Sequence, residues 1–427
     1  MAGRLAYLHK SAQCRAVEDL AISWIEAGGV TSPQGFSAGA VYAGVKDYGE
    51  VAGRLDVALL SSTVPCQAAG VFTQSRVPGA PVTVSREHLR DGQAQAVVVN
   101  SGCANVALGK RGVADARRMA SCAGEKLGVA VQDVLVASTG VIGRPLPMPK
   151  IEAGLAALTL SDDSAGGAAF ARAIMTTDTV PKSRAASATL PDGRVVTVGG
   201  SAKGSGMAHP NMATVFCFLT TDAPVSAAVL QPMLKRVADL SLNMVDVDMD
   251  TSTSDSMAVL ANGLVGGAPV GGDSPEARVL ETLLTAVAVE LARELARDGE
   301  GANTLIEATV EGARSVEDAR MAARTIVSSP LIKTMVTGRD PNLGRVMMAL
   351  GRCGAEVEVE RVSIYIFDSC AFRNGEPSEV DYAKLSKAMD VPEVKLRVDL
   401  GLGDGRATAW GCDLTADYVR INAEYTT

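Results

Sequence analysis

The chain has 427 residues, 47% of them hydrophobic and 21% charged, which suits two or three compact domains and excludes a disordered or coiled-coil protein. Its 40 lysines and arginines against 48 aspartates and glutamates give a net charge of -8, which argues against nucleic-acid binding. No apolar run approaches the about 18 to 20 residues of a membrane span, so we expect no membrane segment.

The N-terminal residues carry a faint targeting composition. Residues 1–16 contain basic residues and no acid, as transit peptides do, but an ordinary frayed tail is the simpler interpretation. The eight cysteines form no CxxC pair, so we expect reduced, mostly buried thiols. We therefore expect a cytoplasmic protein, or a protein of the mitochondrial matrix if the source is eukaryotic.

Two apolar runs in the first half predict buried strands. Residues 97–99 lead into Asn-Ser-Gly at 100–102, and residues 134–136 lead into Ser-Thr-Gly at 138–140. Each reads as a strand followed by a tight loop. Polar groups where buried strands end are typical of functional sites.

The second half predicts a long helix and further strands. Ser274 followed by Pro275 is typical of a helix start, and apolar residues then recur every three or four positions until Asp298-Gly299. Residues 305–311 alternate like a half-buried strand, and residues 395–409 predict a hairpin that turns at 403–405. The fold class is therefore mixed α and β.

Two stretches rich in Gly, Ser, Asp and Pro are candidate linkers, residues 161–167 and residues 263–274.

The common catalytic motifs are weak in this sequence. With only three histidines, a Ser-His-Asp triad has few candidate bases. The carboxylates at 246–250 could hold a hard cation, but they also fit the edge between a strand and a loop, and we expect no metal. The glycine-rich stretch 199–206 lacks the order of a nucleotide-binding P-loop.

One segment combines a turn with a core strand. Residues 203–223 form a small-residue loop that turns at Pro210-Asn211 and then feeds an apolar strand, so Ala213-Thr214 stand at a loop-to-strand junction. By composition alone, a loop before a core strand would explain the segment.

This segment resembles the self-cleavage region of the ornithine acetyltransferases, also called glutamate N-acetyltransferases, whose chain breaks between Ala and Thr. The resemblance extends over nearly the whole chain from about Gly28. Further stretches match the family in order: residues 30–36, 138–143, 251–255, 298–302, 329–334, 340–342 and 421–427.

The resemblance implies an α/β fold of layered sheets flanked by helices that processes itself into two chains. The cut would separate an α chain, residues 28–213, from a β chain, residues 214–427, with residues 1–27 as an extension of unclear role. Threonine is a poor nucleophile without a base, and cleavage would supply one, because the freed α-amine of Thr214 has a pKa of about 7.7 to 8.0.

The resemblance also assigns roles to individual residues. Thr214 would be the nucleophile, and Thr139 with Gly140 would stabilise the oxyanion. The substrate-binding residues that it implies are Thr177, Lys203, Thr214, Glu300, Asn422 and Thr427. Taken singly, each of these has an ordinary structural alternative, such as a turn former or a solvated charge.

The implied reaction moves an acetyl group from N2-acetylornithine to glutamate in arginine biosynthesis. Acetyl-CoA serves some members as a second donor, and no feature of the sequence decides its use here. No metal or prosthetic group is implied, and the expected assembly is a heterotetramer of two α and two β chains. An amidase or aminopeptidase with the same type of nucleophile, and an uncleaved non-catalytic relative, remain alternatives.

The sequence departs from the family pattern at a few positions. Cys103 and Ser254 stand where the family usually has Asn, Leu343 stands where it usually has Trp, and residues 106–109 replace a usual Ala-Cys-Thr-Gly. We expect these changes to affect substrate preference rather than reaction type.

Overall fold

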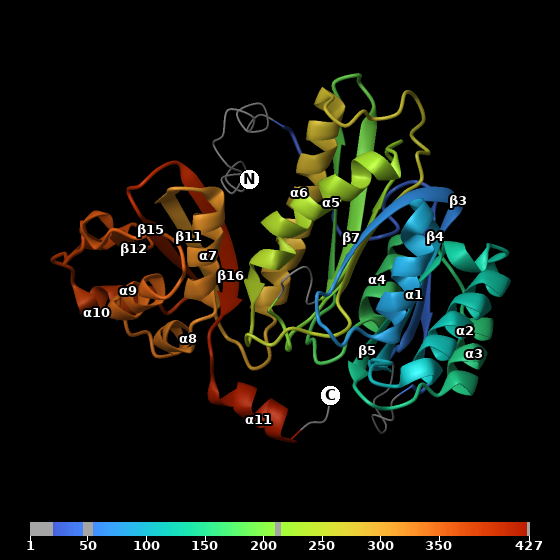
Figure 1. Cartoon of the computed structure of the whole chain (residues 1–427), viewed down its shortest axis with the longest axis horizontal. Coiled ribbons are helices and arrows are strands. Elements are labelled where there is room, and N and C mark those ends of the chain that lie inside the picture. Colours follow the sequence, from blue (N-terminus) through green and yellow to red (C-terminus); the bar gives the residue numbers. More distant parts are fainter. Residues whose placement is uncertain (1–19, 46–53, 210–214, 425–427) are drawn as a thin grey trace.

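The structure, a computed structural model, describes residues 20–45, 54–209 and 215–424. Two mixed β-sheets form its framework (Figure 1). The strands of the first sheet are β1 (Ser23–Trp24), β2 (Phe36–Val41), β3 (Val57–Phe72), β4 (Gln93–Cys103), β5 (Val134–Val141), β6 (Lys182–Thr189), β7 (Val195–Lys203), β8 (Phe216–Thr221) and β10 (Ser256–Ala261). The strands of the second sheet are β9 (Val245–Asp246), β11 (Leu305–Ala313), β12 (Ser363–Ile366), β13 (Ser369–Arg373), β14 (Glu376–Pro377), β15 (Glu393–Asp399) and β16 (Gly405–Cys412).

Strands from both halves of the chain build the first sheet. Its order is β1-β6-β7-β8-β10-β3-β4-β5, and β2 also pairs with β3. The strands β7 and β8, which flank residues 210–214, pair antiparallel from Val198 opposite Thr221 to Lys203 opposite Phe216. Strand β10 lies parallel to β8 and antiparallel to β3. The two chains that cleavage would produce therefore share one hydrogen-bonded sheet.

Most of the α-helices cover the faces of the two sheets, and α11 (Ala416–Glu424) lies apart from both (Figure 1). The other helices are α1 (Ala80–His88), α2 (Gly109–Leu127), α3 (Met148–Ala157), α4 (Ser164–Ala173), α5 (Ala227–Leu240), α6 (Pro275–Arg297), α7 (Val316–Val327), α8 (Pro330–Thr337), α9 (Gly344–Gly351) and α10 (Tyr382–Ala388). The described residues also form four short 3-10 helices: Leu89–Asp91, Val131–Asp133, Leu242–Met244 and Val359–Arg361.

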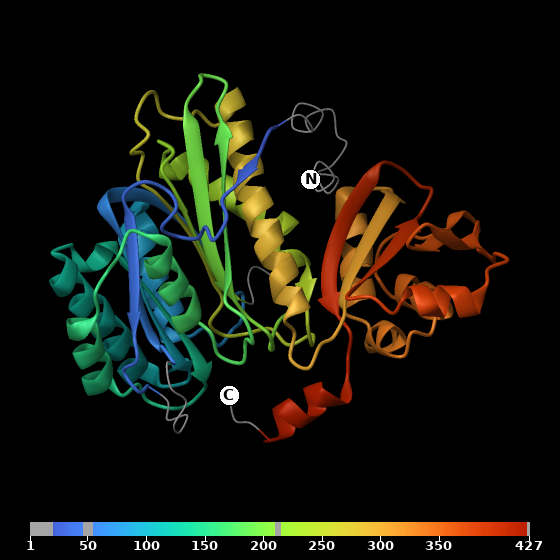
Figure 2. The ribbon, with the colours of Figure 1, turned by 180° about the vertical axis from the view of Figure 1, so that it is seen from behind.

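Side-chain alternation along the strands separates the core into layers. On β8, Phe216 and Phe218 pack with Phe170 of α4, whereas the intervening Cys217 joins the core beneath α5 and α6. Helices α1 and α2 cover the other end of the sheet, over β4 and β5, and α3 packs against α2 and the strands β2 and β3 (Figure 1). Helix α6 contacts β7 of the first sheet and β16 of the second, so it joins the two sheets, as the reverse view in Figure 2 also shows.

The expected mixed α and β class is confirmed, and so is the long helix. Ser274 caps α6 by accepting a hydrogen bond from the Ala277 amide at 3.1 Å, Pro275 occupies the first turn, and Asp298 is the C-cap. Its apolar stripe is buried, from Leu280 through Leu295. The strand expected at 305–311 is β11.

Three expectations about local structure were wrong. Residues 100–102 and 138–140 are not tight loops, because β4 and β5 stay paired in parallel through Gly102 opposite Gly140. Residues 395–409 are not a hairpin, because β11 lies between β15 and β16 and pairs with both. Residues 161–167 are not a linker, because Asp163 caps α4 by accepting from the Gly166 amide at 3.0 Å. The other candidate linker, residues 263–274, is an irregular connection between β10 and α6.

Within the described residues, no helix is long and apolar enough to cross a membrane. The cysteines in these ranges are free, and most of them are buried.

Candidate active site

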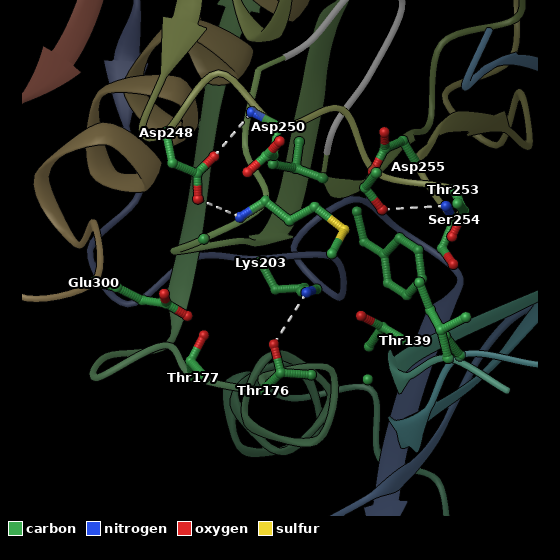
Figure 3. Close-up of a pocket in the computed structure, with 18 of the residues that line it drawn as sticks. Thr139, Thr176, Thr177, Lys203, Asp248, Asp250, Thr253, Ser254, Asp255 and Glu300 are labelled. Carbon is green, nitrogen blue, oxygen red and sulfur yellow. Dashed lines mark hydrogen bonds between the residues drawn. The ribbon is translucent and has the colours of Figure 1, made fainter. Parts of the chain in front are cut away.

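A pocket of about 130 Å³ lies at one end of the first sheet, where β5 and β7 end and β8 and β10 begin (Figure 3). Every predicted site residue within the described ranges lines it: Thr139, Gly140, Thr177, Lys203, Glu300 and Asn422. Val215 and Phe216 also line it. Ala213, Thr214 and Thr427 lie outside the described residues, but Val215 brings the chain to the pocket directly after position 214.

The ends of β4 and β5 fix the two residues predicted to stabilise an oxyanion. Gly140 has a φ of +120°, and a Cβ built there would lie 2.4 Å from the carbonyl carbon of Gly102, so only glycine fits. The Thr139 hydroxyl faces the pocket and has no hydrogen-bond partner among the described residues (Figure 3). This end of β5 thus offers the pocket a free hydroxyl donor beside a glycine backbone.

Lys203 provides the cation of the pocket. Its Nζ donates to the Thr176 hydroxyl at 3.1 Å and lies 5.7 Å from the centre of the Phe216 ring. Burial lowers the pKa of Lys203, and the negative charges of Asp178, Asp255 and Glu300 partly offset that effect.

A buried ion network holds the Lys203 strand end against the preceding turn. The Lys182 ammonium lies 2.6 Å from a carboxylate oxygen of Asp178 and 2.6 Å from one of Asp298. Asp178 also accepts the amides of Thr176 at 3.0 Å and Gly204 at 2.7 Å. Burial alone would raise the pKa of Asp178, but Lys182 and Lys203 lower it overall. One carboxylate therefore ties residues 176 and 204 together on either side of the pocket.

The opposite wall of the pocket is acidic. Glu300 is only 9% exposed, and its amide donates to the Ser205 carbonyl at 2.7 Å. Asn422 of α11 donates through Nδ2 to Oε2 of Glu300 at 2.7 Å. A Cβ on Gly206 would lie 2.5 Å from the carboxyl carbon of Glu300, so glycine lets this loop pass beside the carboxylate.

Two more carboxyl groups flank this wall. Asp248 accepts the amides of Met207 at 2.7 Å and Ala208 at 2.9 Å, and burial raises its pKa. Burial also raises the pKa of Asp255 well above its usual value, and its Oδ2 has no hydrogen-bond partner. The next residue, Ser256, donates its amide to the Val215 carbonyl at 3.1 Å, so Asp255 lies close to the start of β8.

Two of the carboxylates considered for a hard cation, Asp246 and Asp248, have protein partners. Asp246 contacts His209 at 2.8 Å and Lys333 at 3.1 Å, while Asp248 binds backbone amides. In the described ranges, no group of three or more His, Cys, Asp or Glu residues is arranged to hold a metal.

Comparisons with known proteins identify the family. The ArgJ family profile matches residues 37–427. An arginine biosynthesis bifunctional protein ArgJ from Symbiobacterium thermophilum is 49% identical and aligns with 95% of this chain and 100% of its own length. A protein of the same name from Dehalococcoides mccartyi is 48% identical over 94% of this chain and 98% of its own. The chain belongs to the ArgJ family.

A solved structure was also found, that of an ornithine acetyltransferase complexed with ornithine from Mycobacterium tuberculosis. It has 39% identity and a TM-score of 0.41, and the alignment covers 45% of this chain and 100% of that chain.

The departures from the usual ArgJ family pattern have different surroundings. Leu343 is 4% exposed in the large hydrophobic core and does not line the pocket. Cys103 is buried beneath α2, while its neighbour Ala104 lines the pocket. Ser254 lines the pocket directly. Of these positions, Ser254 is therefore placed to affect substrate preference.

Sequence reasoning missed several polar residues of this ArgJ family pocket. Thr176 binds Lys203, Ser205 lies 2.7 Å from the Thr177 hydroxyl, and the Tyr418 hydroxyl donates to Asp248 at 3.2 Å. Tyr418 precedes Asn422 by one helical turn of α11, so the spacing i, i+4 was the available signal. Thr176 and Ser205 follow only from the folded turn.

Proposed function

We propose that this protein transfers the acetyl group of N2-acetylornithine to glutamate in arginine biosynthesis, through an acetyl ester on Thr214. The proposal includes self-cleavage between Ala213 and Thr214. Its main support is that the hydroxyl of Thr139, the cation of Lys203 and the carboxylate of Glu300 converge on one pocket beside the first residue of β8. Family membership gives the reaction class its second support.

Self-cleavage would give the nucleophile its base. The Thr214 hydroxyl attacks the Ala213 carbonyl, the peptide C–N bond breaks, and water hydrolyses the resulting ester. The new α-amine has a pKa of about 7.7 to 8.0, so about 10 to 20% of it at pH 7 and about half to two thirds at pH 8 is neutral and can accept a proton.

Acetyl transfer would then proceed in two halves. The Thr214 oxygen attacks the acetyl carbonyl while its proton passes to the α-amine, and the tetrahedral oxyanion accepts hydrogen bonds from Thr139 and Gly140. The C–N bond breaks, and ornithine leaves with the proton. Glutamate then attacks the ester through its amino group and restores the threonine hydroxyl. The kinetics of such a reaction are ping-pong.

The charges of the pocket suit the donor. Both substrates carry an α-carboxylate, for which Lys203 is a cation and Thr177 a hydroxyl donor. Glu300, held by Asn422 at 2.7 Å, is an anion suited to the side-chain ammonium of ornithine. Thr427 is part of the proposed substrate site as the family resemblance implies.

The cut chains would remain associated. Strand β8 of the second chain pairs with β7 of the first, and β10 lies between β8 and β3. Separation would expose the buried faces of these strands and break the ladder. The proposal includes the α2β2 heterotetramer, acetyl-CoA as an additional donor and no prosthetic group. It locates the reaction in the cytoplasm, and the bacterial relatives lend no support to a mitochondrial location.

The test is a transfer assay on the purified protein with N2-acetylornithine and glutamate. The proposal predicts N-acetylglutamate and ornithine in equal amounts, parallel double-reciprocal lines, and no product from Thr214→Ala. Acetate release that does not require glutamate would identify an amidase instead. Absence of both products would support the non-catalytic alternative.

A further inference from the structure

A second cavity, of about 650 Å³, lies on the other side of the wall that closes the active-site pocket. In the segment 248–252, Asp248, Asp250 and Ser252 line the first pocket, whereas Met249 and Thr251 line the second. The segment bends at Met249, which has a φ of +66°, so neighbouring side chains face different cavities, and an isolated bridge pairs Thr251 with Ala208. The far wall of the second cavity is helix α7 with the end of α9, the orange elements of Figure 1.

Arginines dominate the charge of this second cavity. Arg320, Arg324 and Arg352 line it, with Glu317 as the one acidic lining residue in the described ranges. Arg320 is paired with Asp239 at 3.0 Å. The Arg352 guanidinium is exposed and has no hydrogen bond or ion pair with any described residue.

The neighbouring histidine adds no further positive charge in the observed arrangement. Arg324 donates to Nε2 of His209 at 3.2 Å, and because a guanidinium cannot accept, Nε2 must be the unprotonated nitrogen. Nδ1–H then donates to Asp246 at 2.8 Å. Burial lowers the pKa of Arg324, the nearby charge of Arg320 lowers it further, and the negative charges of Asp246 and Asp239 partly offset both effects. An anion in the cavity would relieve this repulsion between guanidinium groups.

The same cavity presents two exposed methionines. Met249 is 47% exposed and Met321 is 41% exposed, and both line it. Thioethers make favourable contacts with aromatic rings, and guanidinium groups bind phosphate oxygens in bidentate geometry. The cavity therefore offers a surface for a planar ring beside groups for several anionic oxygens.

We propose that this cavity binds a phosphorylated nucleoside, with its phosphates on Arg320, Arg324 and Arg352 and its base against Met249 and Met321. The nucleotide end of CoA has this chemistry, and the choice of CoA as a ligand rests on the proposed function. The wall of residues 248–252 puts such a ligand next to the acetyl-transfer pocket without sharing its polar groups.

The test is calorimetric titration of the full chain at low salt with adenosine 3′,5′-bisphosphate, CoA and inorganic pyrophosphate. We expect the bisphosphate and CoA to bind, pyrophosphate to bind more weakly, and Arg352→Gln to raise both nucleotide dissociation constants about tenfold to a hundredfold. Arg352 is exposed, so this variant should fold. Arg361→Gln, which removes an exposed arginine paired with Glu358, is the matched control and should leave them unchanged.

Several results would overturn the inference. The bisphosphate could fail to bind, or pyrophosphate could bind as tightly as the bisphosphate. The Arg352→Gln variant could bind nucleotides like the wild type, or Arg361→Gln could lose as much affinity as Arg352→Gln. Titration requires no turnover, so it reports on this cavity independently of the transfer assay. If the wild-type protein transfers no acetyl group, the proposed function is refuted, and the nucleotide-binding result still stands.

Discussion

Replacement of Lys182 by methionine should lower the free energy of unfolding by about 3 to 5 kcal/mol, because it removes the ammonium that two buried carboxylates share. The Lys182 side chain is 1% exposed, that of Asp178 0% and that of Asp298 7%, so little solvent screens the interaction. Methionine fills a similar volume, which keeps the loss of packing small. The carboxylates of Asp178 and Asp298 would then lie close together in a buried site, and their mutual repulsion adds to the stability lost with the ion pairs.

The assay is urea unfolding of Lys182→Met in a Thr214→Ala background, which keeps the chain in one piece in the proposed mechanism. The predicted loss corresponds to about two to three and a half powers of ten in the folded-to-unfolded ratio. Asp298→Asn is the comparison, because it leaves Lys182 paired with Asp178 and should cost less. A loss below about 1 kcal/mol in Lys182→Met would refute the reasoning that this network is dry and tightly coupled.

The same network predicts an acid dependence. The pKa of Asp178 is lowered in the fold, so its stabilising contribution is complete above its unfolded pKa of about 3.9 and is lost as the pH falls through the lower folded value. Lys182→Met should weaken this loss in urea titrations between about pH 5 and pH 2. An unchanged acid profile would contradict the assignment.

Further predictions concern the pocket. Thr139→Val should lower kcat on the cleaved enzyme by about 10² to 10³ with KM little changed, as steady-state kinetics would measure, whereas an unchanged kcat would remove the hydroxyl from the oxyanion site. Glu300→Gln should raise KM for N2-acetylornithine about tenfold to a hundredfold and that for glutamate less, and equal effects on both would contradict its role as the ammonium partner. Because burial lowers the pKa of Lys203, KM for glutamate should begin to rise at a lower pH than the usual lysine value of about 10.4 allows. A pH series on wild type and Lys203→Met checks this, since the variant should lack the rise.

The sequence correctly predicted structural features that depend only on neighbouring residues. Ser274 and Pro275 begin α6 because a side-chain cap and a fixed φ need only neighbouring residues. The alternating pattern at 305–311 likewise marked β11.

The pairing of strands that lie far apart in the chain could not be predicted from the sequence. Strands β15 and β16 looked like a hairpin because a glycine-rich turn joins them, but β11, about ninety residues earlier in the chain, takes the place between them. Asp163 likewise looked like part of a linker, whereas it caps α4.

In the candidate site, too, the sequence predicted the residues that belong to motifs and missed the interactions that depend on the fold. Family motifs pointed to Lys203 and Glu300, but motifs carry no information on the network behind them. Asp178 reaches Lys182, Thr176 and Gly204 only when the turn before β6 folds against the end of β7. Burial, not residue type, sets the raised pKa of Asp255, and burial is a property of the finished fold.

The most direct test of the account is the intact mass of the purified protein beside that of Thr214→Ala, because the proposed mechanism depends on freeing one α-amine. The account predicts two fragments that meet between Ala213 and Thr214 in the wild type and a single full-length chain in the variant. A single full-length chain in both proteins after long incubation would contradict it, since no N-terminal threonine would then exist to catalyse acetyl transfer.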